Sequence, residues 1–130
     1  MNQSLSILYL DDDDEHLELF KHMFGKTYDV RVAATPGEAR RMLAERAADI
    51  IISDQSMPEI EGTEFLREVA AAYPDSYRIM LTGTTAVGKM LREIGTGVIN
   101  LFITKPWDED HLRRSFERAG VMARSRMKDD

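Results

Sequence analysis

Five acidic residues follow one another in the stretch LYLDDDDEHLELF, directly after an apolar run, with Asp11 first and Glu15 last. Carboxylates a few ångströms apart repel each other, and crowding them raises a pKa or destabilises the fold unless water or a cation screens the charge. The acidic run is therefore either solvated or the binding place of something positive.

Three later segments also place a polar side chain at or just after the end of an apolar run. Asp54 follows DIIIS, Thr82 ends YRIMLT, and Lys105 follows VINLFIT. Each run has the length of a strand, and several are rich in β-branched residues. In open parallel sheets, ligands bind outside the carboxyl ends of the strands, near the point where the strand order reverses. In a parallel sheet these three side chains would therefore crowd one rim together with Asp11 and Asp12.

The elements that must position these residues can be read from the apolar pattern. Short apolar runs predict five strands, at residues 5–10, 28–33, 49–53, 77–82 and 98–104. Apolar residues at helical spacing predict five amphipathic helices, near residues 17–24, 39–43, 65–69, 87–94 and 112–119.

The second predicted helix has the best start signal, the sequence TPGE. Thr35 would be its N-cap, Pro36 would take the first helical position, and Glu38 is placed to close a capping box. The first predicted helix begins near Asp13, and the acids there would interact favourably with the helix dipole. We therefore expect the acids from Asp13 to Glu15 to be helix-start residues and not ligands.

Strict alternation of apolar strands and helices predicts an α/β fold, a doubly wound five-stranded parallel sheet with helices on both faces. Right-handed crossovers then fix most of the topology. No repeat or linker divides the 130 residues, so we expect one domain over residues 1–130, with a core of about 5–123. The end of the chain, 124–130, is polar and expected to fray.

Composition excludes several classes of site and partner. The chain has no cysteine, so any metal must use oxygen or histidine ligands. Its formal net charge is -6, whereas binding to the phosphate backbone of a nucleic acid requires positive charge. We therefore expect no direct nucleic-acid binding. No basic leader and no run of about 18 apolar residues is present, which predicts a soluble, cytoplasmic protein without a membrane span.

Four motifs, ILYLDDD, IIISDQSMPEIEG, IMLTG and FITKPW, resemble the receiver domain of two-component response regulators, the CheY-like superfamily. The resemblance covers essentially the whole chain. Each motif alone is weakly specific, but an acidic pair, an Asp-x-x-Met-Pro followed by glycine, a Thr-Gly and a Lys-Pro form a specific set in this order. The resemblance implies a flavodoxin-like (βα)5 fold and transfer of a phosphoryl group from a histidine kinase or histidine phosphotransfer protein to Asp54.

The resemblance also implies a Mg²⁺ cofactor and a role for each motif residue. Asp12 would bind the ion directly, Asp11 mainly through water, and Asp54 and the backbone carbonyl of Ser56 would complete the protein ligands. Two carboxylates, a carbonyl and a phosphate oxygen suit Mg²⁺, which prefers octahedral oxygen coordination. Lys105, aimed inward by a cis Lys-Pro peptide, would bind a second phosphoryl oxygen and stabilise the charge of transfer.

A switch follows from the same resemblance. The hydroxyl of Thr82 would bind a third phosphoryl oxygen and draw the loop after the fourth strand inward. Phe102, in the switch-aromatic position, would then rotate into the space that this loop leaves. Taken alone, Phe102 at inward strand spacing is equally compatible with a fixed core residue. The changed face of the fourth helix, fifth strand and fifth helix would then recruit a partner, an output domain or a second copy.

Three small residues occupy positions that modulate the phosphate lifetime in the family: Ser56, Gly83 and Thr84. Ser56 and Thr84 are uncharged, so we expect neither to block nor strongly to orient the attacking water, giving an intermediate lifetime. Gly83 would leave the phosphate open to a small donor or a partner histidine.

Two other functions compete with the receiver reading. YLDDD also contains the Asp-x-Asp of magnesium-dependent phosphohydrolases of the haloacid dehalogenase type, with Asp11 as nucleophile; Glu15 and the lack of room for a cap domain disfavour it. A receiver-like module that no longer takes phosphate is disfavoured because every required position is filled. We expect no enzyme with an external product. His16, His22 and His111 show no mutual metal spacing and are expected on the surface or on a helix face.

Overall fold

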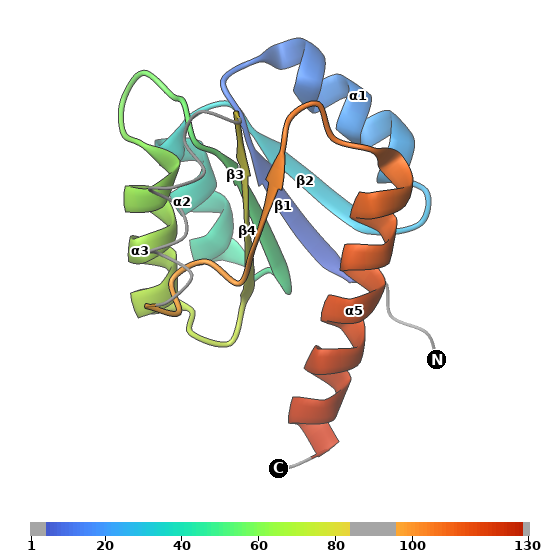
Figure 1. Ribbon diagram of the computed structural model, residues 1–130. Coiled ribbons are helices and arrows are strands. Elements are labelled where there is room, and N and C mark those ends of the chain that lie inside the picture. The colour runs from blue at the N-terminus through green and yellow to red at the C-terminus, as the bar shows by residue number, and fades with distance from the viewer. Residues whose placement is uncertain (1–4, 84–95, 129–130) are drawn as a thin grey trace.

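Five parallel strands form one sheet in the order β2-β1-β3-β4-β5 (Figure 1). The computed structural model describes residues 5–83 and 96–128. The strands are β1 (Ser6–Leu10), β2 (Asp29–Ala33), β3 (Ile50–Asp54), β4 (Tyr77–Thr82) and β5 (Leu101–Thr104). The order reverses between β1 and β3, because the chain runs from β1 outward to β2 and then returns to the other side of β1. The predicted doubly wound, flavodoxin-like sheet is confirmed.

Four helices of the described residues cover the sheet: α1 (Asp14–Phe24), α2 (Pro36–Glu45), α3 (Gly62–Ala72) and α5 (Glu109–Lys128). Figure 1 shows α1 and α5 on one face and α2 and α3 on the other. The predicted helix near residues 87–94 lies outside the described residues. The helix α5 continues to Lys128, whereas we expected a fraying tail from residue 124. No glycine or proline interrupts the sequence after Gly120, so nothing local ends the helix earlier.

Each central strand is buried on both sides, and its side chains alternate between two hydrophobic cores. In β1, Ile7 and Tyr9 pack with α1 and α5, while Leu8 and Leu10 pack with α2 and α3. This period of two is the geometry of a strand. It also explains the continuous apolar runs, because a parallel sheet covered by helices has no solvent face.

The start of α2 follows the capping signal closely. The Oγ1 of Thr35 accepts a hydrogen bond from the backbone N–H of Glu38 at 3.1 Å, and Pro36 stands at the first helical position. The return bond differs from a capping box, because the Glu38 carboxylate accepts from the N–H of Ala34 at 3.1 Å and not from that of Thr35. The cap predicted for α2 is therefore confirmed, with its second bond shifted by one residue.

β5 is shorter than the strand predicted at residues 98–104. The buried Arg78 of β4 donates from Nε to the carbonyl oxygen of Val98 at 2.7 Å, and the side chain of Asn100 accepts from the N–H of Arg78 at 2.7 Å. One backbone bond remains before Leu101, from the N–H of Asn100 to the carbonyl oxygen of Arg78 at 2.9 Å, while side-chain bonds satisfy the N–H of Arg78 and the carbonyl of Val98. The apolar pattern could not show this, because it does not report which partner satisfies each backbone group.

Candidate functional site

Three carboxylates meet where the strand order reverses. Asp11 and Asp12 follow β1, Asp54 ends β3, and one oxygen from each lies within 4.8 Å of the others. Asp11 and Asp54 are buried, whereas Asp12 is exposed. Neighbouring parallel strands end at the same edge of the sheet, so the topology alone brings these acids together. The structure thus assembles the acidic cluster that the sequence predicted.

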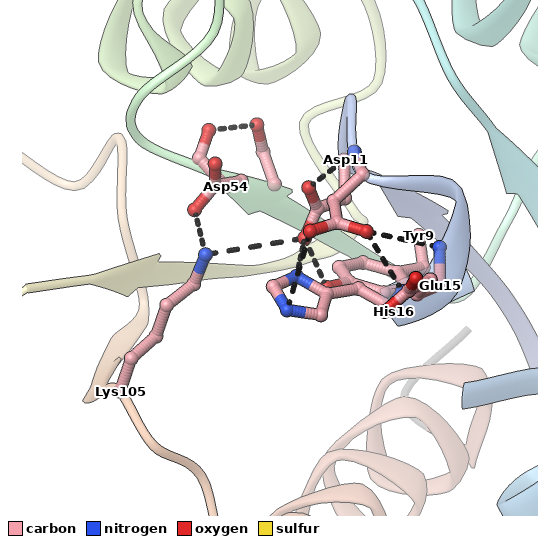
Figure 2. Close-up of polar contacts among 8 residues, drawn as sticks. Tyr9, Asp11, Glu15, His16, Asp54 and Lys105 are labelled. Atoms are coloured by element: carbon pink, nitrogen blue, oxygen red, sulfur yellow. Dashed lines mark hydrogen bonds and ion pairs between the residues drawn. The ribbon is translucent and has the colours of Figure 1, made fainter. Parts of the chain in front are cut away.

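Lys105 supplies the positive charge of the cluster. Its Nζ lies 2.5 Å from Oδ1 of Asp54 and 3.9 Å from Oδ2 of Asp11 (Figure 2). The backbone holds the lysine there, since its N–H donates to the carbonyl of Thr82 at 2.9 Å. The Lys105–Pro106 peptide is cis, as expected. Burial raises the pKa of the Asp54 carboxyl, and Lys105 opposes this shift by stabilising the ionised form. Three carboxylates against one ammonium leave two formal negative charges uncompensated.

Asp11 is the most extensively hydrogen-bonded acid of the cluster. Its Oδ1 accepts from the backbone N–H of Asp13 at 3.0 Å, and its Oδ2 accepts from the hydroxyl of Tyr9 at 2.5 Å. The Nδ1 of His16 lies 3.1 Å from the same Oδ2 (Figure 2). Burial, followed by the hydrogen bond to Asp11, raises the pKa of the Tyr9 phenol far above its usual range, so the hydroxyl remains a donor.

All three histidines lie on the surface or on a helix face, as expected, but the sequence did not indicate the contact between His16 and the acidic cluster. His22 and His111 are exposed, but the half-exposed His16 reaches back from the first turn of α1 to Asp11 and Asp13. The position of His16 in the sequence could have indicated this contact, because His16 lies in the first turn of a helix that starts beside the acidic pair. Tyr9 could have been found as well, because residues two apart in a strand share a face.

The loop after β3 brings the start of α3 against Asp54. A Cβ on Gly62 would lie 2.4 Å from the carbonyl oxygen of Asp54, so only glycine fits this approach. Gln55 fixes the contact: its backbone carbonyl accepts from the N–H of Gly62, and its side-chain oxygen accepts from the N–H of Thr63, both at 3.0 Å. The buried Gln55 thus caps α3 in place of Glu61, whose side chain makes no capping bond.

The remaining predicted residues surround the cluster at different depths. Thr82 is buried, and its hydroxyl donates to the carbonyl of Gly83 at 3.3 Å. Phe102 lies beside Met80 in register and is half-buried against the core under α2 and α3. Ser56 is exposed in the loop after β3, and space is open around the Cα of Gly83. Thr84 lies outside the described residues.

The donor set at the cluster fits a hard divalent cation. The three clustered groups are all carboxylates, and oxygen is the ligand atom that Mg²⁺ prefers. The two uncompensated formal charges match the charge of such an ion. The exposed Asp12 leaves one side of the cluster open to solvent, which agrees with the tendency of Mg²⁺ to keep several waters.

A 2-1-3-4-5 parallel sheet with clustered acids and a lysine at its switch point defines a receiver-type signalling domain. A family model described as the response regulator receiver domain matches residues 7–117, and the chain belongs to this family. The membership of the receiver family that the four motifs predicted is therefore confirmed.

Curated relatives and solved structures agree with this assignment. The chain is 28% identical over 124 residues to the hydrogenase transcriptional regulatory protein HoxA of Cupriavidus necator, covering 92% of this chain and 26% of HoxA. It is 30% identical over 114 residues to the transcriptional regulatory protein GlrR of Escherichia coli, covering 87% of this chain and 26% of GlrR. The chain thus spans about a quarter of the length of these relatives.

The signal receiver domain of an HD domain-containing protein from Pseudomonas fluorescens Pf-5 superposes with a TM-score of 0.88 at 26% identity, covering 98% of this chain and 95% of that one. The chemotaxis protein CheY4 of Vibrio cholerae gives a TM-score of 0.81 at 27% identity, covering 89% and 98%. Among the described residues, no helix is long and apolar enough to cross a membrane.

Proposed function

We propose that this receiver domain accepts a phosphoryl group on Asp54 from a histidine kinase or a histidine phosphotransfer protein, with Mg²⁺ bound at the acidic cluster. The observation that carries the proposal is the position of Asp54. Its carboxylate ends the central strand, within 4.8 Å of the acids after β1, and Lys105 lies 2.5 Å away. A nucleophile, a candidate metal site and a fixed cation therefore converge on one point.

In the proposed reaction, an oxygen of Asp54 forms a bond to phosphorus while the P–N bond to the donor histidine breaks. The electron pair of that bond returns to the imidazole nitrogen. Both reactants are anionic, so the site must supply positive charge. Mg²⁺ would neutralise charge on the phosphoryl oxygens, with Asp12 as direct ligand, Asp11 acting mainly through water, and Asp54 and the carbonyl of Ser56 completing the protein ligands.

Lys105 would have two partners during the reaction. Before transfer its ammonium pairs with Asp54. During transfer it would bind an equatorial phosphoryl oxygen and stabilise the spread charge. The hydroxyl of Thr82, which now donates to a neighbouring carbonyl, would turn to a third oxygen. Both residues lie at the ends of adjacent strands, Thr82 as the last residue of β4 and Lys105 directly after β5.

The readout would pass from Thr82 to Phe102 and the surface of β5 and α5. Movement of the loop after β4 would free space for the half-buried ring of Phe102. That face would then bind an output domain, a partner protein or a second copy of the chain. The names of HoxA and GlrR describe transcriptional regulators, which supports an output in the control of transcription.

We place the receiver unit at about residues 5–123 and expect it to catalyse its own phosphorylation and dephosphorylation, without an external product. The small side chains of Ser56 and Thr84 would give the phosphoryl group an intermediate lifetime. Gly83 would leave it open to a small donor.

The test is a phosphorylation assay with acetyl phosphate and Mg²⁺, read by mass spectrometry of the intact protein. Wild type should gain one phosphoryl group, whereas Asp54→Asn should gain none. Asp49→Asn is the matched control, because it removes a carboxylate just before the opposite end of the same strand. Equal labelling of wild type and Asp54→Asn would refute the proposal.

Peptide mapping of the phosphoryl label distinguishes a phosphohydrolase of the haloacid dehalogenase type from a receiver domain. That alternative requires the label on Asp11. Both oxygens of Asp11 already accept hydrogen bonds, which disfavours it as a nucleophile. A label on Asp54 supports the receiver mechanism, and a label on Asp11 contradicts it.

A further inference from the structure

We propose that Tyr9 and His16 are positioning residues for the metal site: together they hold one oxygen of Asp11, so that Asp11 stays fixed while Asp12 remains free to bind the ion. The inference rests on the proposed function, since it concerns the same cluster. It assigns roles to two residues that none of the four sequence motifs marks as functional.

Counting the acceptor positions of Asp11 gives the first argument. An ionised carboxylate has about four lone-pair positions. The Asp13 N–H occupies one on Oδ1, and the Tyr9 hydroxyl and the Nδ1 of His16 occupy two on Oδ2. Since an ionised carboxylate only accepts, Nδ1 of His16 carries the proton. Asp11 therefore has little capacity left for direct coordination and is held to orient a water of the ion.

Asp12 presents the opposite situation. Its side chain is exposed, and no described residue donates a hydrogen bond to it. It can therefore turn toward an incoming ion without breaking an existing contact. The two neighbouring acids thus differ in how many hydrogen bonds hold them, and Tyr9 and His16 supply two of the three at Asp11.

Tyr9 is itself rigidly held, which a positioning residue requires. It is fully buried near the end of β1, and its ring packs on Phe20 of α1 with a centroid separation of 4.6 Å. Residues two apart in a strand share a face, and Asp11, directly after β1, lies within hydrogen-bond reach of the hydroxyl. His16 comes from a different element, the first turn of α1, and its Nε2 also lies 3.6 Å from Oδ2 of Asp13. Two elements therefore hold one carboxylate.

Loss of either donor should weaken metal binding. Groups that orient a metal ligand through a second layer of hydrogen bonds typically contribute about 10- to 100-fold in metal affinity. Tyr9→Phe removes only the hydroxyl and leaves the ring in the core. Tyr77→Phe is the matched control, because Tyr77 belongs to the same hydrophobic core but begins β4, at the opposite end of the sheet from the cluster.

The experiment measures the Mg²⁺ dissociation constant of the full chain by isothermal titration calorimetry. We expect a rise of about tenfold for Tyr9→Phe and no more than twofold for Tyr77→Phe. His16→Ala should raise the constant several-fold. His16→Asn, whose amide can donate from a position near that of Nδ1, should restore it. The histidine pair keeps the test decisive if Tyr9→Phe does not fold, since His16 is half-exposed.

The outcomes separate the two proposals. If the wild type does not bind Mg²⁺, the proposed function fails. If the wild type binds Mg²⁺, but Tyr9→Phe and His16→Ala bind as tightly or more tightly, the positioning role is wrong and the proposed function stands. If Tyr77→Phe weakens binding as much as Tyr9→Phe, the effect is one of packing, and the inference is again overturned.

Discussion

At the scale of single residues, the three carboxylates of the site have different environments. Asp54 is buried and paired with Lys105, Asp11 is buried and hydrogen-bonded on both oxygens, and Asp12 is exposed. The environment therefore pairs one carboxylate with a cation, binds one through both of its oxygens and leaves one exposed to solvent. Removing Lys105 would leave Asp54 as a buried charge without its partner, which is strongly destabilising in general.

Asp12 is the acid whose removal should stabilise the fold without metal. It adds negative charge to a cluster that already has an excess, and no described hydrogen bond is lost with it. We expect Asp12→Ala to raise the midpoint of thermal unfolding by about 2 °C or more in the presence of EDTA. Circular dichroism measures the midpoint.

Asp14→Ala is the control for the charge itself. Asp14 is also exposed but lies in the first turn of α1, where the helix dipole favours an acid. Its removal should leave the midpoint unchanged or lower it. An Asp12→Ala protein that unfolds at or below the wild-type temperature would contradict the crowding of charge at the cluster.

At the scale of elements, the junction of β3 and α3 matters most for the site. Asp54 occupies the last position of the strand, and the helix starts against its carbonyl with Gly62. Gln55 ties the two together by capping the helix from a position next to the acid. A buried side-chain cap costs about 1 kcal/mol when it is lost. The junction therefore fixes the backbone from which Asp54 projects.

Gly62→Ala should test this junction. The added Cβ would lie 2.4 Å from the carbonyl oxygen of Asp54 and 3.0 Å from Cα of Gln55, both of which are backbone atoms that cannot turn aside. We expect a loss of about 2 kcal/mol or more in the free energy of unfolding, measured with urea. Phosphorylation of Asp54 should also slow, because the strand end must shift.

Gly37→Ala is the matched substitution in α2. There the nearest atom to an added Cβ is the Oγ1 of Thr35 at 3.9 Å, which is an ordinary contact. Alanine is the better helix former, so this variant should be neutral or slightly more stable. Equal destabilisation by both substitutions would mean that the close approach at Gly62 is unimportant.

At the scale of the whole molecule, the sheet separates two cores and collects the polar groups at one edge. One core packs beneath α1 and α5 and the other beneath α2 and α3. The cluster of Asp11, Asp12 and Asp54 lies at the strand-order reversal, where the loops after β1 and β3 lead to opposite faces and leave a crevice. Binding of a cation there would link α1, β1 and β3 in a single contact.

Mg²⁺ should therefore stabilise the whole domain. At a free concentration of 100 times its dissociation constant, a ligand that binds only the folded state adds about 2.7 kcal/mol. In a domain of this size the midpoint of thermal unfolding should rise by roughly 10 °C. The rise should disappear with EDTA and in Asp54→Asn but persist in Asp49→Asn. A wild-type midpoint that does not respond to Mg²⁺ would show that the cluster binds no ion.

Much of the fold was predictable because its determinants are local. The predicted strand at residues 77–82 coincides with β4, and Thr35 caps α2 as its neighbours indicated. Apolar periodicity reflects burial directly, and a capping residue acts within its own turn. The meeting of Asp11, Asp12 and Asp54 also followed, because parallel strands end at one edge of the sheet.

Only the tertiary structure decided how the polar groups are satisfied. Three sets of bonds join residues that carry no shared sequence pattern: those from Tyr9 and His16 to Asp11, the cap of α3 by Gln55, and the bond from Arg78 to the carbonyl of Val98. A buried donor or acceptor must find a hydrogen-bond partner, and it bonds to a group that the packed chain places within reach. Many groups could serve with similar net energy, so the sequence does not show which one is chosen. The sequence therefore determined which acids meet, and packing determined which of them are hydrogen-bonded and which one is exposed.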